Sequence, residues 1–275
     1  MSSASVLPTN PQPIGRRSAA AIRVDDLTVA YQPGEPVLDR VSLLIEAGQI
    51  VALVGASGCG KSTLLRAIAG LLQPQQGHVE FEPELSRLSG DLSYVFQAPT
   101  LLPWRTVDEN IQLPLELSNG QDKQSHAGAN TLGRSDAIAT ARRSVGLEDF
   151  AATMFPRELS GGMQMRTSIA RALVMDPSVL LLDEPFAALD DILRTKLNEL
   201  LLQLWHARPR TVVFVTHNIA EAIYLSHRVI VLGQGRVAST IENELAWPRQ
   251  AKIRSSLEFA ALYSRISAAL TEVSG

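Results

Sequence analysis

The stretch GASGCGKST, residues 55–63, carries the residue types that bind phosphate groups. It matches the pattern G-x-x-x-x-G-K-[ST] from Gly55 to Ser62, between an apolar, strand-like run and a helix-like pattern. In that context the glycines let backbone N–H groups turn toward phosphates, and the helix N-terminus favours negative charge. Lys61 is expected to reach the β- and γ-phosphates of a nucleotide, and Ser62 to bind Mg²⁺. The alternative interpretation is an ordinary strand–turn–helix.

Two adjacent carboxylates follow a second apolar run, VLLLDEP, at Asp183 and Glu184. Ligands of open α/β sheets bind at the carboxyl ends of the strands, so both side chains are expected near the glycine-rich loop. Asp183 suits a metal-bound water in a nucleotide-hydrolysing site. Glu184 is placed to orient or deprotonate the attacking water. A helix N-cap acid is the alternative role.

A third element, LSGGMQMR, begins at Leu159. Ser160 and two glycines precede a helical pattern, which predicts a second helix N-terminus with close backbone access for an anion. Taken alone, this pattern is more often a simple helix cap.

The composition limits the class of protein. The chain has 275 residues, 45% of them hydrophobic, and a net charge of −3, which argues against binding dominated by nucleic-acid phosphates. The single cysteine, Cys59, cannot form an internal disulfide, which fits a reducing, cytoplasmic setting. We find no apolar run of about 18 residues, and the apolar residues after Arg16 and Arg17 are too few for an export signal.

The elements that must position these residues alternate between strand and helix, which predicts an α/β fold. The three most apolar strand-like runs are expected to be buried on both faces of a parallel sheet. A hairpin is expected to turn at Gly233–Gly235, and a polar surface loop is expected over residues 118–136. Strand-like runs occupy residues 21–31, 49–55, 78–81, 92–97, 178–185, 211–217 and 228–241. Helical patterns occupy residues 61–72, 135–147, 161–175 and 191–205.

With these motifs in this order, the chain strongly resembles the ATPase subunits of ATP-binding cassette (ABC) transporters over about residues 22–245. Tyr31 matches the aromatic residue that the family stacks on adenine. Gln97 matches the family's glutamine at the junction of the core and the helical region, and Leu159–Met163 match its signature motif. Residues 188–190, ALD, match the D-loop, and His217 matches the switch histidine. Bare histidines after strands are usually structural, so only the resemblance assigns His217 a γ-phosphate contact.

The resemblance implies a P-loop ATPase core with a mixed sheet, an antiparallel N-terminal β-subdomain and an inserted helical subdomain at about 98–176. A flexible tail is expected over 1–20, the ATPase domain over 21–245, and a helical tail over 246–275. In that tail Phe259, Leu262, Ile266 and Leu270 recur at helical spacing, which predicts an amphipathic helix packed on the core or on a partner.

The resemblance also implies ATP and Mg²⁺ as ligands and a head-to-tail pair of cassettes in which each ATP lies between the P-loop of one chain and Ser160–Met163 of the other. The expected nucleotide contacts are Tyr31, Gly55, Ala56, Ser57, Gly58, Cys59, Gly60, Lys61, Ser62, Thr63, Ser160, Gly161, Gly162, Met163 and Asp190. The expected catalytic residues are Glu184, His217 and Gln97, and the expected metal ligands are Ser62, Gln97 and Asp183.

One residue departs from the commonest family signature: Met163 stands where LSGGQ has glutamine. Importers of nitrate, sulfonates and taurine often carry methionine there, and LLPWRTV (residues 101–107) also resembles that group. The resemblance implies that the segment after Gln97 forms a groove that holds a cytoplasmic helix of a permease subunit. The expected partners are therefore permease subunits and, indirectly, a solute-binding protein outside the cytoplasm. The cassette would lie on the cytoplasmic face of the membrane. An importer of thiamine-pyrimidine precursors and a non-transport ABC ATPase remain alternative functions. For Pro103 and Trp104, the alternative to a permease contact is a simple packing role.

Overall fold

The computed structural model describes residues 18–32, 34–85, 90–118, 131–187 and 189–274. Its strands are β1 (Ala21–Gln32), β2 (Glu35–Ile45), β3 (Ile50–Gly55), β4 (Gln76–Glu82), β5 (Leu92–Val95), β6 (Val179–Asp183), β7 (Thr211–Val215), β8 (Arg228–Gly233) and β9 (Arg236–Glu242). Its α-helices are α1 (Lys61–Ile68), α2 (Val107–Ser118), α3 (Thr131–Ser144), α4 (Gly161–Leu173), α5 (Asp191–Ala207), α6 (Ile219–Leu225) and α7 (Leu257–Ser274). Short 3₁₀ helices are η2 (Asp149–Thr153), η3 (Pro156–Glu158) and η4 (Ala251–Ser255).

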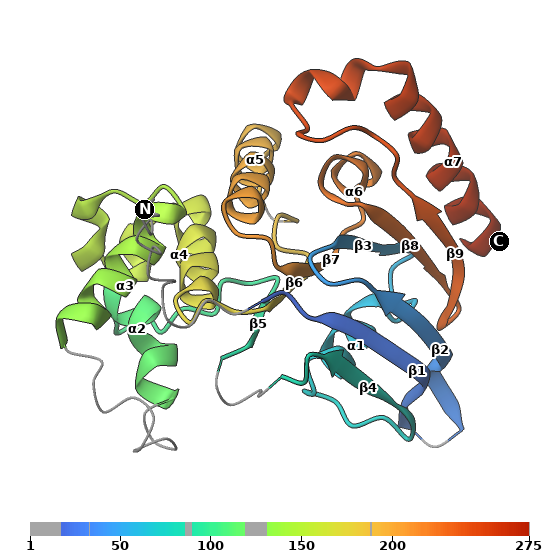
Figure 1. Ribbon diagram of the computed structural model, residues 1–275, viewed down its shortest axis with the longest axis horizontal. Helices are drawn as coiled ribbons and strands as arrows, with labels where there is room; N and C mark the ends of the chain where they lie inside the picture. The colour runs from blue at the N-terminus through green and yellow to red at the C-terminus, as the bar shows by residue number, and fades with distance from the viewer. Residues whose placement is uncertain (1–17, 33, 86–89, 119–130, 188, 275) are drawn as a thin grey trace, which may run out of the picture.

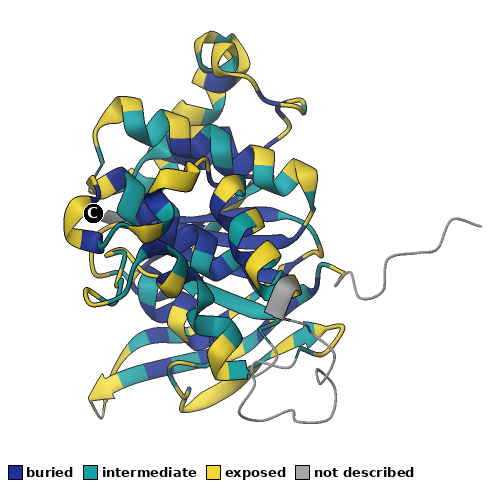
Figure 2. Cartoon of the chain, turned by 90° about the vertical axis from the view of Figure 1, so that its left-hand side faces the viewer, coloured by how far each residue is buried: buried dark blue, intermediate teal, exposed yellow. Residues whose placement is uncertain are grey.

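The larger sheet has six strands in the order β5-β6-β7-β3-β8-β9. The first five run parallel and β9 runs antiparallel to β8, so the expected hairpin at Gly233–Gly235 is confirmed. Every residue of β6 and β7 is buried, as the continuous apolar runs predict for strands covered on both faces. Figure 2 shows that the buried residues, in dark blue, are concentrated in the middle of the molecule.

Alternating side chains of β3 enter two different cores, because successive residues of a strand point to opposite faces. Ile50, Ala52 and Val54 pack in the core beneath α5, α6 and α7. Val51 and Leu53 pack with α1 and the smaller sheet on the other face. Figure 1 shows the larger sheet between these two layers. The strand that leads into the glycine-rich loop is therefore held rigidly from both sides.

The smaller sheet is antiparallel, in the order β2-β1-β4. β2 is absent from the strands expected from the sequence, and this omission was an error. Glu35, Asp39 and Arg40 interrupt its apolar pattern, and Arg40 has a φ of +50° at an irregularity in the pairing with β1. Bulges of this kind break the period-2 alternation that marks a strand.

The described part of residues 98–176 contains helices and no strand, as predicted. Figure 1 shows α2, α3 and α4 together, to one side of the larger sheet. The expected loop over 118–136 is wrong at its ends, because α2 includes Ser118 and α3 begins at Thr131. Ile138 and Ala141 of α3 are buried in the core, which stabilises this helix by packing. Residues 119–130 lie outside the described part, as does nearly all of the expected N-terminal tail.

The C-terminal tail forms α7, which packs across the larger sheet beside α6 (Figure 1). Phe259 and Ile266 are buried in the core, with Leu262 and Leu270 beside them. The amphipathic helix is confirmed, and its apolar face covers its own chain. Among the described residues, no helix has the length and apolar character needed to cross a membrane.

Candidate nucleotide site

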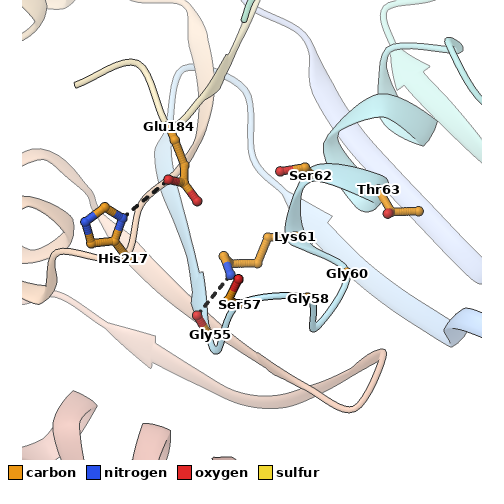
Figure 3. A pocket seen from close by; sticks show the side chains of 9 residues that line it. All are labelled: Gly55, Ser57, Gly58, Gly60, Lys61, Ser62, Thr63, Glu184 and His217. Carbon is orange, nitrogen blue, oxygen red and sulfur yellow. Dashed lines mark hydrogen bonds and ion pairs between the residues drawn. The ribbon is translucent and has the colours of Figure 1, made fainter. Parts of the chain in front are cut away.

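A cavity of about 320 Å³ opens where β3 passes into α1, at the carboxyl end of the parallel strands. Figure 3 shows the P-loop on one side and two side chains from the ends of β6 and β7 on the other. The lining residues are Gly55, Ser57, Gly58, Gly60, Lys61, Ser62, Thr63, Glu184 and His217. Ala56 and Cys59, also expected at the nucleotide, do not line it. The structure thus brings together three segments that are far apart in the sequence.

The loop conformation depends on glycine. Gly58 and Gly60 have φ of +80° and +104°, which side-chain-bearing residues rarely adopt. A Cβ at Gly60 would also lie 2.7 Å from Leu38 Cδ2 and 2.9 Å from the Val37 carbonyl. This turn lets the backbone N–H groups before α1 face the cavity, which is the arrangement that binds anions.

Lys61 is the cation of the cavity. Its side chain lies back across the loop, where Nζ donates to the carbonyl oxygens of Gly55 at 2.9 Å and Ala56 at 2.7 Å. The residue is only 6% exposed, so its charge acts where water screens it little. An ammonium held at this point attracts the terminal phosphates of a nucleotide.

Asp183 lies behind the cavity wall as a buried carboxylate. Ser62 Oγ donates to its Oδ1 at 2.6 Å, and the Tyr94 hydroxyl donates to its Oδ2 at 2.8 Å. The Arg66 guanidinium approaches Oδ2 at 3.7 Å. Burial, reinforced by the Asp183 charge, raises the pKa of Tyr94, so the phenol remains protonated and donates. Tyr94 and Arg66 are absent from the sites predicted from the sequence.

The Ser62 hydroxyl and the Asp183 carboxylate form a donor set that fits Mg²⁺. Both are hard oxygen ligands, and they meet at the edge of the phosphate cavity. Mg²⁺ in proteins usually binds one or two carboxylates together with substrate phosphates. Gln97, the third expected ligand, is exposed two residues beyond β5 and does not line the cavity.

Glu184 and His217 face the P-loop from across the cavity (Figure 3). Glu184 has a φ of +45°, an uncommon conformation for this residue type, which turns the chain directly after buried Asp183. Its side chain is 23% exposed, and its Oε2 lies 3.3 Å from His217 Nδ1. A carboxylate beside an imidazole at the phosphate end of the cavity is suited to orient and deprotonate a water.

The turn that carries His217 is fixed from behind by a polar cluster that the sequence reasoning missed. Thr216 donates its hydroxyl to the buried Glu221 carboxylate, and Asn218 caps α6 by accepting from the Glu221 N–H at 3.1 Å. Burial is the main cause that raises the pKa of Glu221. The pattern N-x-x-E at the start of α6 resembles a capping box and is the signal that predicts this turn.

The glycine pair of LSGGM begins α4, as predicted. Ser160 is its N-cap, accepting from the Met163 N–H at 3.3 Å, and both Ser160 and Gly161 are exposed. Gly162 is buried, with Leu193 so close that a Cβ at Gly162 would lie 2.4 Å from it. Neither Ser160–Met163 nor Asp190 lines the cavity of their own chain. Asp190 caps α5 by accepting from the Leu193 N–H at 2.9 Å.

Tyr31 does not line the cavity but contacts Thr63, which does. Its side chain is 58% exposed, and its hydroxyl is 3.2 Å from Thr63 Oγ1 at the start of α1. An exposed aromatic ring beside a phosphate loop is free to stack on a nucleobase. Ala188, the first residue of the expected D-loop, lies outside the described part.

Four features together define an ATP-binding cassette: a P-loop after β3, a histidine after the adjacent strand β7, paired carboxylates at the end of β6, and a helical insertion whose last helix, α4, begins with a Ser-Gly-Gly cap. The comparisons with known proteins agree. Residues 38–187 match the family model described as ABC transporter, and the chain belongs to this family. It is an ATPase of the ABC transporter type, and the expected fold and family are confirmed.

Two relatives are named "Aliphatic sulfonates import ATP-binding protein SsuB". The protein from Bacillus thuringiensis subsp. konkukian is 40% identical over 233 residues, which cover 84% of this chain and 86% of the relative. The protein from Rhodopseudomonas palustris is 43% identical over 250 residues, which cover 90% of this chain and 83% of the relative. A dimeric post-hydrolysis structure of the ATP-binding cassette MJ0796 bound to ADP and Pi has a TM-score of 0.71 and 32% identity, covering 82% of this chain and all of that one.

Proposed function

We propose that the chain energises a membrane importer of aliphatic sulfonates or a closely related small organic solute. The observation that carries this proposal is the identity of 40–43% to sulfonate-import ATPases along more than four fifths of both chains. The segment LLPWRTV and the methionine at position 163 support the same group. The cassette does not itself contact the transported solute, so the relatives carry the substrate assignment.

Within this proposal, each residue of the cavity has one task in hydrolysis. Lys61 and the backbone N–H groups of the P-loop bind the β- and γ-phosphates. Ser62 and Asp183 hold Mg²⁺, which when bound offsets phosphate charge in the transition state. Glu184 accepts the proton of the attacking water, and His217 contacts the γ-phosphate. Gln97 would reach the metal or the water only after the segment beyond β5 moves toward the cavity.

We propose further that two chains pair head to tail around ATP. Ser160 and Gly161 are exposed at the start of α4, although they are absent from the cavity of their own chain. A helix N-terminus of this kind fits the γ-phosphate of a nucleotide bound by a second chain. The dimeric structures of MJ0796 support this arrangement, in which Asp190 would lie near the contact.

Trp104 is proposed to contact the permease. Its side chain is 70% exposed on the segment that leads from Gln97 into α2, whereas a packing role would bury it. Exposed tryptophans are enriched among residues that dominate protein interfaces. This contact would place the chain at the cytoplasmic face of the membrane.

Deletion of the gene in its source organism tests the importer assignment. We expect loss of growth on an alkanesulfonate as sole sulfur source, with normal growth on sulfate. The wild-type gene should restore growth, and a Glu184→Gln copy should not. Normal growth of the deletion strain on several alkanesulfonates, together with impaired use of taurine, nitrate or a thiamine precursor, would assign a different solute.

A further inference from the structure

Tyr94 contacts the buried carboxylate of the site from β5, a strand with no assigned part in hydrolysis. β5 lies parallel to β6 at the edge of the larger sheet, with Tyr94 opposite Leu181. From that position its hydroxyl reaches Asp183 Oδ2 at 2.8 Å. Its ring packs against Phe96, with 4.6 Å between the ring centroids.

The two oxygens of Asp183 have different partners. Oδ1 accepts from Ser62, the proposed metal ligand, whereas Oδ2 accepts from Tyr94. The Ser62 hydroxyl has lone pairs as well as its proton, so it can bind a metal while it still donates to Oδ1. The bond from Tyr94 is on the other oxygen and does not compete with the metal. Arg66, at 3.7 Å from Oδ2, is the one cation paired with Asp183 in the described part of the chain.

A hydrogen bond to the far oxygen of a metal-binding carboxylate fixes which oxygen faces the ion. Loss of a group that orients a metal ligand in this way typically lowers metal affinity about 10- to 100-fold. A purely structural role would instead reside in the ring, which fills space beside Phe96.

We propose that Tyr94 is a positioning residue for the divalent cation: its hydroxyl holds Oδ2 of Asp183 so that Oδ1 faces the metal beside Ser62. This inference rests on the proposed role of Asp183 as a metal ligand. Tyr94 also lies three residues before Gln97, so β5 holds the hydroxyl that contacts Asp183 and leads directly into the segment that connects to the helical region.

The test measures Mn²⁺ binding by electron paramagnetic resonance, with the non-hydrolysable ATP analogue AMP-PNP bound. The variants are Tyr94→Phe, Asp183→Asn and Tyr263→Phe, the last of which removes a hydroxyl from a half-exposed tyrosine on α7. We expect Tyr94→Phe to weaken Mn²⁺ binding roughly 10-fold and Tyr263→Phe to leave it unchanged. Binding of AMP-PNP in EDTA should stay within about twofold of wild type, because the P-loop contacts remain, and it reports correct folding of each variant.

Two results separate this inference from the proposed function. If Asp183→Asn leaves Mn²⁺ affinity unchanged, Asp183 is not a ligand and the metal site is wrong. If Asp183→Asn weakens binding but Tyr94→Phe does not, the metal site stands and the positioning role is overturned. In the Asp183→Asn background, Tyr94→Phe should have little further effect. A full 10-fold loss there would mean that Tyr94 acts by another route, which also overturns the proposal.

Discussion

Replacing Glu184 with glutamine should stop hydrolysis without preventing ATP binding. The substitution keeps the side-chain shape and removes the basic oxygen that faces the cavity. Its neighbour His217, 3.3 Å away, can still pair with the amide. Lys61 and Ser62 lie on the opposite wall of the cavity, and Asp183 lies behind the wall with its bond from Ser62, so these contacts are kept.

The expected size of the effect follows from these contacts. A positioned general base contributes about 10²- to 10⁴-fold to a rate. At about 1.36 kcal/mol for each tenfold change, its loss raises the barrier by about 2.7–5.4 kcal/mol. The backbone at position 184 has a φ of +45° in either case, so the cost of that conformation is the same for both residues. We therefore expect a turnover loss of at least about 100-fold with little change in thermal stability.

Steady-state phosphate release measures the turnover, and binding of a fluorescent ATP analogue measures affinity. Gel filtration with and without ATP then tests pairing, because a stalled variant should accumulate as a dimer. Ser160→Arg in the same background is the control, since a long side chain at the exposed start of α4 should prevent pairing. Normal hydrolysis by Glu184→Gln would refute the catalytic role. Binding without turnover and without dimer would retain that role and refute ATP-driven pairing of the isolated chains.

Three further predictions follow from other parts of the chain. Lys61→Ala should abolish ATPase activity and weaken nucleotide binding about 10- to 100-fold, as expected for losing a hydrogen bond to a charged group. The control, Lys196→Ala on the exposed side of α5, should change neither property. Wild-type turnover by Lys61→Ala would refute the site. Glu221→Gln should raise the melting temperature relative to wild type more at pH 8 than at pH 5. Burial raises the pKa of Glu221, so the native state favours its neutral form, and the wild-type protein loses stability as pH rises through that pKa. A difference in melting temperature that stays constant across pH would contradict this prediction. Trp104→Ala should leave the ATPase activity of the isolated chain within about twofold of wild type. It should weaken capture of the permease about 30-fold, which is the effect of losing an interface residue worth about 2 kcal/mol, and Tyr263→Ala is the control. Lost ATPase activity with intact capture of the permease would favour a packing role for Trp104.

The P-loop could be predicted from the sequence because all its parts are contiguous. The turn, the cation and the helix N-terminus follow one another over residues 55–63, and no long-range contact is needed to recognise them. Asp183 and Glu184 could be placed by a general property of parallel sheets, whose carboxyl ends meet at one edge. The structure adds that they face different surroundings: the Asp183 side chain is buried, whereas the Glu184 side chain is partly exposed toward the cavity.

Tyr94 and Glu221 could not be assigned from the sequence, because their roles depend on packing between distant segments. Tyr94 is one of several large side chains in a strand, and only the pairing of β5 with β6 brings its hydroxyl to Asp183. The helical patterns predicted from the sequence do not include α6, and only the placement of this helix against the core buries Glu221. β2 was missed for a related reason: local irregularities disguise its pattern, and pairing with β1 determines the strand.

The position of Arg194 connects the separate parts of the cassette. Its guanidinium donates to the carbonyl oxygens of Phe186 at 3.3 Å and Leu189 at 2.8 Å, and so fixes the segment that follows Glu184. The preceding residue, Leu193, packs directly against Gly162 at the start of α4. Because Gly162 leaves no free space there, a shift of α4 must displace α5, and α5 holds the chain beside the catalytic carboxylate. A phosphate bound at the start of α4 by a second chain would therefore act on Glu184 of the same chain through packed side chains, which gives the proposed dimer a physical means of linking its two sites.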